Sequence, residues 1–181
     1  DYDFPTKEEI VNIMQAAKDV EATTATEEIK AVPLLDYEVE GGKIVKTKPI
    51  RMLNAEEWTL TNGCKVYYKF CDQNGIKVSL LGESSGGMSL LPAENLPSAS
   101  ALSTLAMYSG LYKHDVQMMQ EILKGYHVQP NITLGETFEG VSGVCDNNEM
   151  EMLLQIIYLL FEHPRFDQND FEKFVYLNRL Q

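Results

Sequence analysis

Apolar and polar side chains alternate along residues 58–80, which is the two-residue period of β-strands. Asn62-Gly63 interrupts the alternation with a dipeptide that favours the tight turn of a hairpin. A second polar turn over 72–75 leads into another alternating segment, which ends at Gly86-Gly87. The pattern therefore predicts a β-hairpin followed by a third strand.

After Gly87, apolar positions recur with helical spacing in several segments. Asp115 and Asp167 are suited to cap two of the helices, and Pro164 ends another. Two further strand patterns are separated by Gly135-Glu136, which indicates a tight turn. The predicted helices cover 97–108, 115–125, 147–163 and 167–181, and the predicted strands cover 128–134 and 137–144. This order predicts an α+β fold in which helices pack on one face of a largely antiparallel sheet. The last helix reaches Gln181 without a stop signal, which predicts a domain truncated at its C-terminus.

The N-terminal part has a different pattern. Thr6 and Glu9 have the spacing of a capping box and precede apolar residues at helical spacing. Residues 21–53 are rich in Thr, Glu and Lys and contain several helix and strand breakers, which predicts a linker. We therefore expect a helix over 1–20 that belongs to or packs on a preceding domain, a linker over 21–53, and an incomplete domain over 54–181. An N-terminal arm wrapped on its own domain remains the alternative.

Composition excludes several classes of protein. With 44% hydrophobic and 23% charged residues over 181 positions, the chain has the balance of an ordinary folded domain. Its net charge of −12, without a basic cluster, argues against a nucleic-acid partner. The most apolar stretch, 153–161, is far shorter than the roughly 20 residues that a membrane-spanning helix needs. We expect neither nucleic acid nor a membrane span.

Candidate ligands and nucleophiles are present, but their spacing fits no common site. An odd number of cysteines without a C-x-x-C pair predicts structural thiols rather than a zinc ribbon. The histidines lie in three separate segments without an i, i+4 partner, and no serine lies in a G-x-S-x-G turn. Acidic residues from 136 onward lack calcium-loop spacing and favour a solvated helix start. The residues concerned are Cys64, Cys71, Cys145, His114, His127, His163, Ser84, Ser85, Ser89, Ser103, Glu136, Glu139, Asp146, Glu149 and Glu151.

The order and spacing of several short signposts resemble insulinase/pitrilysin-type zinc metallopeptidases and mitochondrial processing peptidase subunits. The signposts are Trp58 with Leu60, Asn62-Gly63, Lys65-Val66, Ser85-Gly86-Gly87, Gly110, Glu139-Gly140-Val141-Ser142-Gly143, Leu154-Gln155-Ile156-Ile157-Tyr158 and Pro164-Arg165-Phe166-Asp167. Each is weak alone, and their order carries the resemblance. The chain most resembles a segment of the non-catalytic C-terminal half of a long bacterial zinc protease.

Two departures determine what this resemblance implies. The family's His-x-x-Glu-His would fall at 101–105, where this chain has Ala-Leu-Ser-Thr-Leu, and the family's third ligand would fall at or beyond its end. The resemblance therefore implies a chamber-forming segment that is inactive alone, with no catalytic, cofactor-binding or metal residues carried over. It implies zinc in the parent protein, and the catalytic half and a peptide substrate as partners. The strand end over 80–89 is a candidate peptide contact by β-augmentation.

Two other interpretations remain open. A scaffold or binding module of the same fold within a larger assembly is the main alternative, and an unrelated α+β binding domain is the second. The resemblance suggests the bacterial periplasm or cell envelope, although no residue specifies a compartment.

Overall fold

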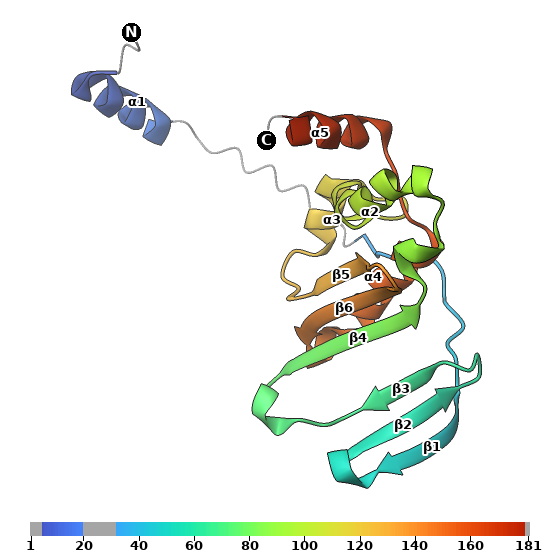
Figure 1. Cartoon of the computed structure of the whole chain (residues 1–181). Coiled ribbons are helices and arrows are strands. Elements are labelled where there is room, and N and C mark those ends of the chain that lie inside the picture. Colours follow the sequence, from blue (N-terminus) through green and yellow to red (C-terminus); the bar gives the residue numbers. More distant parts are fainter. Residues whose placement is uncertain (1–4, 20–31, 180–181) are drawn as a thin grey trace. The chain divides into compact units, whose positions relative to one another are not determined.

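The computed structural model describes residues 5–19 and 32–179, which belong to two compact units that divide between Val32 and Pro33 (Figure 1). The first unit contains helix α1 (Lys7–Asp19). The backbone N–H of Thr6 donates to Glu9 Oε2 over 2.7 Å, and that of Glu9 donates to Thr6 Oγ1 over 3.3 Å. This reciprocal pair satisfies two N–H groups that the first turn leaves free, and it confirms the predicted capping box. That α1 belongs to a preceding domain stays a prediction.

The first sheet of the second unit contains the predicted hairpin. Strands β1 (Ile44–Ile50), β2 (Ala55–Leu60) and β3 (Lys65–Tyr68) pair antiparallel in the order β1-β2-β3. Gly63 has φ +84° in the β2–β3 turn, a conformation that glycine adopts without steric cost. Trp58 stacks on Tyr68 with ring centroids 5.0 Å apart, which joins the two strands on one face.

The predicted linker over 21–53 is wrong for its second part. Residues 44–50 form β1, and Leu34 belongs to the core with 2% exposure. Residues 20–31 lie outside the described part of the chain. The strand escaped prediction because its lysines and Pro49 look like loop sequence, whereas an edge strand tolerates both.

The second sheet brings together segments distant in sequence. Strands β4 (Lys77–Ser85), β6 (Phe138–Asp146) and β5 (Gln129–Leu134) pair antiparallel in the order β4-β6-β5. The register runs from Lys77 opposite Asp146 to Ser85 opposite Phe138. In the described residues β4 therefore forms an edge of this sheet, as Figure 1 also shows. The predicted α+β class is confirmed, with the antiparallel strands divided between two sheets.

Four helices complete the second unit: α2 (Leu96–Tyr108), α3 (Val116–Ile122), α4 (Met150–Glu162) and α5 (Gln168–Arg179). Helix α4 contacts β5 and β6, and α2 contacts β5 and α5. The predicted caps form: Asp115 accepts the N–H of Met118 over 2.8 Å, and Asp167 accepts that of Asn169 over 2.9 Å. The core cluster consists of Leu34, Leu111, Ile156 and Leu159, two of which lie on α4. Helix α4, predicted over 147–163, therefore contributes half of the core cluster.

Residues 33–37 pack on their own domain, as the alternative of an N-terminal arm predicts for this stretch. Asp36 accepts a hydrogen bond from Tyr112 Oη over 2.9 Å and pairs with Lys113 at 2.5 Å. The ring of Tyr37 lies edge-on to Tyr112 and His163, with centroids 6.1 and 6.2 Å away. These contacts hold residues 33–37, the N-terminal arm, against the core cluster to which Leu34 belongs.

We expect the stability of the protein to depend on pH in the alkaline range through Tyr37. Burial, together with the hydrogen bond to Tyr158, raises the pKa of Tyr37 to about 12. An unfolded tyrosine has a pKa of about 10, so the folded state disfavours the phenolate. The stability that the neutral Tyr37 phenol contributes is therefore complete below about pH 10 and is lost as the pH rises through about 12.

Absorbance at 295 nm measures this ionisation directly. The wild-type chain is expected to contain one late-titrating tyrosine that Tyr37→Phe removes. Tyr67→Phe changes an exposed tyrosine of β3 and serves as the matched control. A late phase that persists in Tyr37→Phe contradicts the assignment.

Candidate functional site

Helix α2 carries the positions at which the resemblance leads one to look for metal ligands. Ala101 and Thr104 face α5 across a groove of about 610 Å³. The lining consists of Ser100, Ala101, Thr104, Tyr108, Asp170, Lys173, Phe174, Leu177 and Asn178. Its one carboxylate, Asp170, is paired with Lys173 at 3.2 Å. The described lining residues thus include no histidine or cysteine, and the groove offers a neutral, mostly apolar contact surface.

The Gly86-Gly87 strand end has a structural explanation. The N–H of Gly87 donates to Glu139 Oε2 over 2.9 Å, and Gly87 has φ +74°. A Cβ at Gly87 would lie 2.5 Å from the backbone oxygen of Gly135. The glycines therefore allow close approach of the end of β4 to the β5–β6 turn.

The candidate serines are dispersed. Ser84 and Ser85 lie in β4, and Ser103 lies in α2. Ser89 donates its hydroxyl to Gly86 O over 3.1 Å. In the described residues no histidine hydrogen-bonds to any of these hydroxyls, and that none of these serines is catalytic stays a prediction.

The three cysteines differ in environment. Cys145 is fully buried, and its thiol lies 4.0 Å from the sulfur of Met150. Burial, with a contribution from the nearby Glu149 and Asp146 carboxylates, raises the pKa of the Cys145 thiol. Cys64 and Cys71 are exposed, before and after β3. The prediction of a structural thiol fits Cys145.

The histidines also differ. His114 Nε2 lies 3.3 Å from Leu34 O, and His163 lies among tyrosine rings, 5.3 Å from that of Tyr112. His127 has no i, i+4 partner, as the sequence indicated, but it has acidic neighbours that are distant in the sequence.

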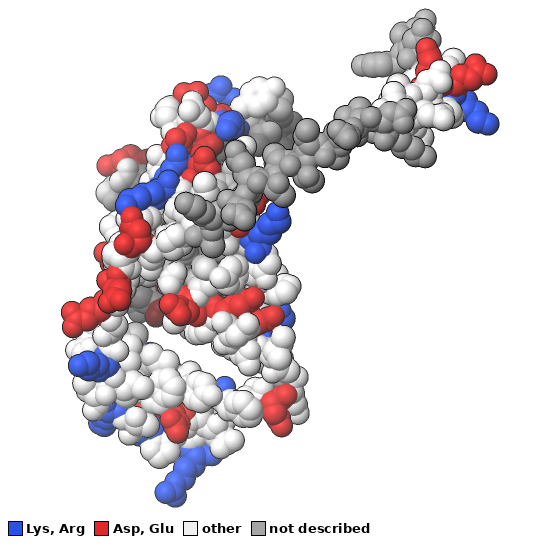
Figure 2. Space-filling view, turned by 180° about the vertical axis from the view of Figure 1, so that it is seen from behind, with Lys and Arg blue, Asp and Glu red and all other residues white. Residues whose placement is uncertain are grey.

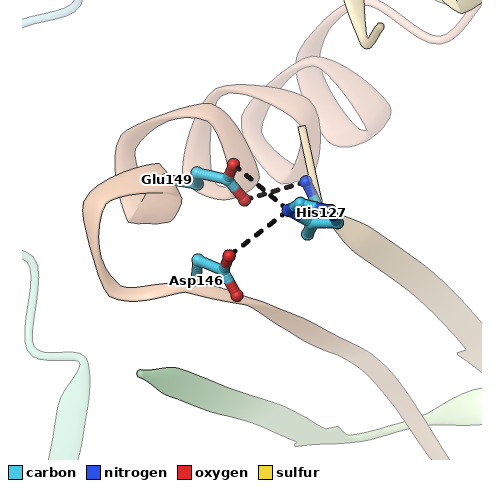
Figure 3. Close-up of side chains that lie close together, drawn as sticks. All are labelled: His127, Asp146 and Glu149. Carbon is cyan, nitrogen blue, oxygen red and sulfur yellow. Dashed lines mark hydrogen bonds and ion pairs between the residues drawn. The ribbon is translucent and has the colours of Figure 1, made fainter. Parts of the chain in front are cut away.

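His127, Asp146 and Glu149 form a three-residue cluster (Figure 3). His127 lies just before β5, Asp146 ends β6, and Glu149 lies in the 3₁₀ turn before α4. The Nδ1 atom of His127 is 3.3 Å from Asp146 Oδ2 and 3.9 Å from Glu149 Oε1. The side chain of His127 is 69% exposed, whereas those of Asp146 and Glu149 are 12% and 9% exposed. Three elements thus place two buried carboxylates beneath one accessible imidazole.

Each carboxylate of the cluster has a second partner. Glu149 Oε2 accepts the backbone N–H of His127 over 2.9 Å. Lys77 Nζ lies 2.6 Å from Asp146 Oδ1 as an ion pair without good hydrogen-bond geometry. The Lys77 ammonium, and to a lesser extent His127, lower the pKa of the Asp146 carboxyl, although burial opposes this shift. Asp146 therefore stays ionised in its buried position.

Sequence reasoning assigned Asp146 and Glu149 to a solvated helix start and missed their contact with His127. The observed β5–β6 register pairs Gln129 with Val144, and its continuation brings His127 beside Asp146. A two-residue turn at Gly135-Glu136 does not give this register. Instead Gly135 lies opposite Phe138 and donates to its carbonyl oxygen over 2.8 Å, so the turn is centred on Glu136-Thr137, one residue later than predicted. The remaining acidic residues lie elsewhere: Glu139 contacts Gly87, and Glu151 accepts from Gln155 over 3.2 Å.

The outer surface gives little indication of a polyanionic partner. On the face shown in Figure 2, Lys and Arg side chains are scattered among Asp and Glu. None of the described helices combines the length and apolar character needed to cross a bilayer. That the chain has no nucleic-acid partner stays a prediction.

Comparison with solved structures identifies the class of fold: that of insulinase/pitrilysin-like peptidases. A point mutant of the ferredoxin protease FusC, in complex with Arabidopsis ferredoxin, has a TM-score of 0.67 and 24% identity. The periplasmic protease PqqL from Escherichia coli has a TM-score of 0.72 and 14% identity. In both comparisons 94% of this chain is covered, but only 19% of the other chain, so this chain spans about a fifth of either protease. No protein-family model and no curated protein matches the sequence.

Proposed function

We propose that this chain is a non-catalytic, chamber-forming segment of a longer insulinase/pitrilysin-type zinc endopeptidase whose catalytic zinc site lies elsewhere in the parent chain. The observation that carries the proposal is the set of residue types in helix α2. The fold is that of a peptidase, yet residues 101–105 of this helix are Ala-Leu-Ser-Thr-Leu, which offer no zinc ligand and no general base. By the resemblance, α2 corresponds to the helix that carries the zinc ligands in the catalytic half, and it lacks the groups that would perform hydrolysis.

The segment's contribution is then to bind and enclose the substrate. The α2–α5 groove offers apolar contacts without a net charge, since Lys173 neutralises Asp170. The free edge of β4 offers backbone groups to an extended peptide, which adds as a further strand without strict sequence choice. Zinc in the catalytic half supplies the activated water, and residues of this chain orient the peptide and exclude solvent.

The neighbours suggest the kind of substrate and compartment. FusC was crystallised with a protein, ferredoxin, and PqqL is a periplasmic protease. We therefore propose a peptide or protein substrate and a place in the bacterial periplasm or cell envelope. The catalytic half of the same protease is the proposed partner.

The test compares this chain with the longer protein from which it derives. A quenched fluorescent peptide library is expected to be cleaved by the longer protein only, and chelation followed by Zn²⁺ addition is expected to abolish and restore cleavage. Cleavage by the 181-residue chain alone overturns the proposal. If the longer protein does not cleave the peptides either, the proposed function is wrong, and the alternative of a scaffold or binding module takes its place.

A matched pair of variants in the longer protein tests the role of β4. Leu81 lies exposed on β4, and Leu90 is equally exposed but lies beyond the strand. Leu81→Glu is expected to raise KM for peptide several-fold, while Leu90→Glu leaves it unchanged. Equal KM values for both variants contradict a peptide contact at this strand. Gly86 is unsuitable for this purpose, because a Cβ there would lie 2.5 Å from Glu139 Oε2 and disturb the fold itself.

A further inference from the structure

We propose that His127, Asp146 and Glu149 bind one divalent transition-metal ion, of which Zn²⁺ is the representative, at a site separate from α2. Their candidate ligand atoms all lie within 4.8 Å of one another. Zinc bonds of about 2.0–2.2 Å in a tetrahedron place neighbouring ligand atoms roughly 3.3–3.6 Å apart. The observed separations of 3.3 Å and 3.9 Å from His127 Nδ1 approach that spacing without a change of backbone. An ion at the centre requires only small side-chain adjustments.

The charges and hydrogen bonds of the cluster favour a bound cation. An imidazole nitrogen carries at most one hydrogen, yet carboxylate oxygens of both Asp146 and Glu149 face Nδ1 of His127. The two carboxylates carry two negative charges, and Lys77 supplies one positive charge at Asp146 Oδ1. A histidine that binds a metal is neutral, so in that state one negative charge of the cluster has no positively charged partner among the described residues. Buried carboxylates require neutralising partners, and a divalent ion between the three side chains supplies both charge and bonds.

The second oxygens of both carboxylates are already held by the chain. Glu149 Oε2 binds the backbone N–H of His127, and Asp146 Oδ1 meets Lys77. Outer contacts of this kind fix the orientation of metal-binding carboxylates and raise metal affinity. The arrangement therefore leaves one free oxygen of each carboxylate directed toward the imidazole nitrogen.

The donor set selects the class of ion. One imidazole nitrogen with two carboxylate oxygens suits Zn²⁺ and neighbouring transition metals, whereas Ca²⁺ and Mg²⁺ prefer six or more oxygen ligands. The exposure of His127 leaves room for a water molecule to complete the coordination. Bound metal would join the loop before β5, the end of β6 and the start of α4, so the site acts as a structural clamp within this unit.

The experiment uses the 181-residue chain after removal of metals by chelation. Isothermal titration with Zn²⁺ is expected to give one saturable site per chain, and Co²⁺ is expected to give the visible absorption of a tetrahedral complex. Ca²⁺ in excess is expected not to displace Zn²⁺. Absence of saturable Zn²⁺ binding overturns the proposal.

Variants assign the ion to these residues. Loss of an outer partner typically weakens metal binding 10–100-fold, so loss of a ligand in His127→Ala is expected to weaken Zn²⁺ binding by about 10-fold or more. This side chain is mostly exposed, and its backbone N–H contact to Glu149 remains, so the variant is expected to fold. His163→Ala is the matched control, because that histidine lies among tyrosine rings away from the cluster. Equal Zn²⁺ affinity in wild type and His127→Ala overturns the assignment.

This site and the proposed function fail independently. Metal binding is measured on the isolated chain without any peptide, and cleavage is measured on the longer protein. The longer protein carrying His127→Ala is expected to retain cleavage, since its catalytic zinc is proposed to lie in the other half.

Discussion

Leu159→Ala is expected to lower the free energy of unfolding by about 2–5 kcal/mol, the range for large-to-small changes in a packed core. Leu159 is fully buried on α4 and belongs to the core cluster with Leu34, Leu111 and Ile156. Truncation removes apolar contacts and leaves a cavity that close packing on three sides cannot fill. Because small domains are stable by only about 5–15 kcal/mol, the loss is a large part of the total.

Urea denaturation followed by circular dichroism measures this effect. Leu154→Ala, on the same helix but 46% exposed, is the matched control. It is expected to cost about 1 kcal/mol or less, because half of its apolar surface is already in water. Equal losses for the two variants would mean that α4 does not pack as the core cluster indicates.

Gly110→Ala is expected to be destabilising by about 2–6 kcal/mol, which combines left-handed backbone strain with a steric clash. Gly110 follows the end of α2 with φ +74°. An added Cβ would press against the backbone oxygen of His114 and lie 2.8 Å from the carbonyl carbon of Asp115. The turn cannot widen easily, because Leu111 and His114 exchange two backbone hydrogen bonds of 2.9 Å.

Gly125→Ala separates the two causes. Gly125 also has a left-handed φ, +88°, but no atom lies within 4 Å of an added Cβ. This control is expected to cost only the backbone strain of about 1–3 kcal/mol. A loss in Gly110→Ala no greater than in Gly125→Ala, measured by the same urea titration, would contradict the predicted clash.

Local signals in the sequence predicted much of the secondary structure. Asn62-Gly63 and the alternation around it gave the β2–β3 hairpin, and Asp115 and Asp167 gave the starts of α3 and α5. These features depend on residues close in the chain, where one side chain meets the backbone two or three positions away. The sequence also showed that residues 101–105 contain no metal ligand, because the residue types that bind metals can be recognised without a structure.

The sequence-based predictions missed features that depend on residues far apart in the chain. Strand β1 contains two lysines and Pro49 and is held in place by its pairing with β2, so its own sequence resembled a linker. Leu34 becomes a core residue only where α4 and the segment after α2 enclose it. Propensity and periodicity describe a segment by itself, and they contain no information on what covers it.

The sequence by itself determined the α+β order of elements, the helix caps, the glycine strand end, and an α2 without metal ligands. Only the tertiary structure decided that His127 meets Asp146 and Glu149. That contact follows from the position of the β5–β6 turn, which sets the strand register. The pairing of β4 with β6 adds Lys77 beside Asp146. A shift of one residue would reverse the faces of β5, so the cluster exists through register, a property of paired strands that neither strand encodes alone.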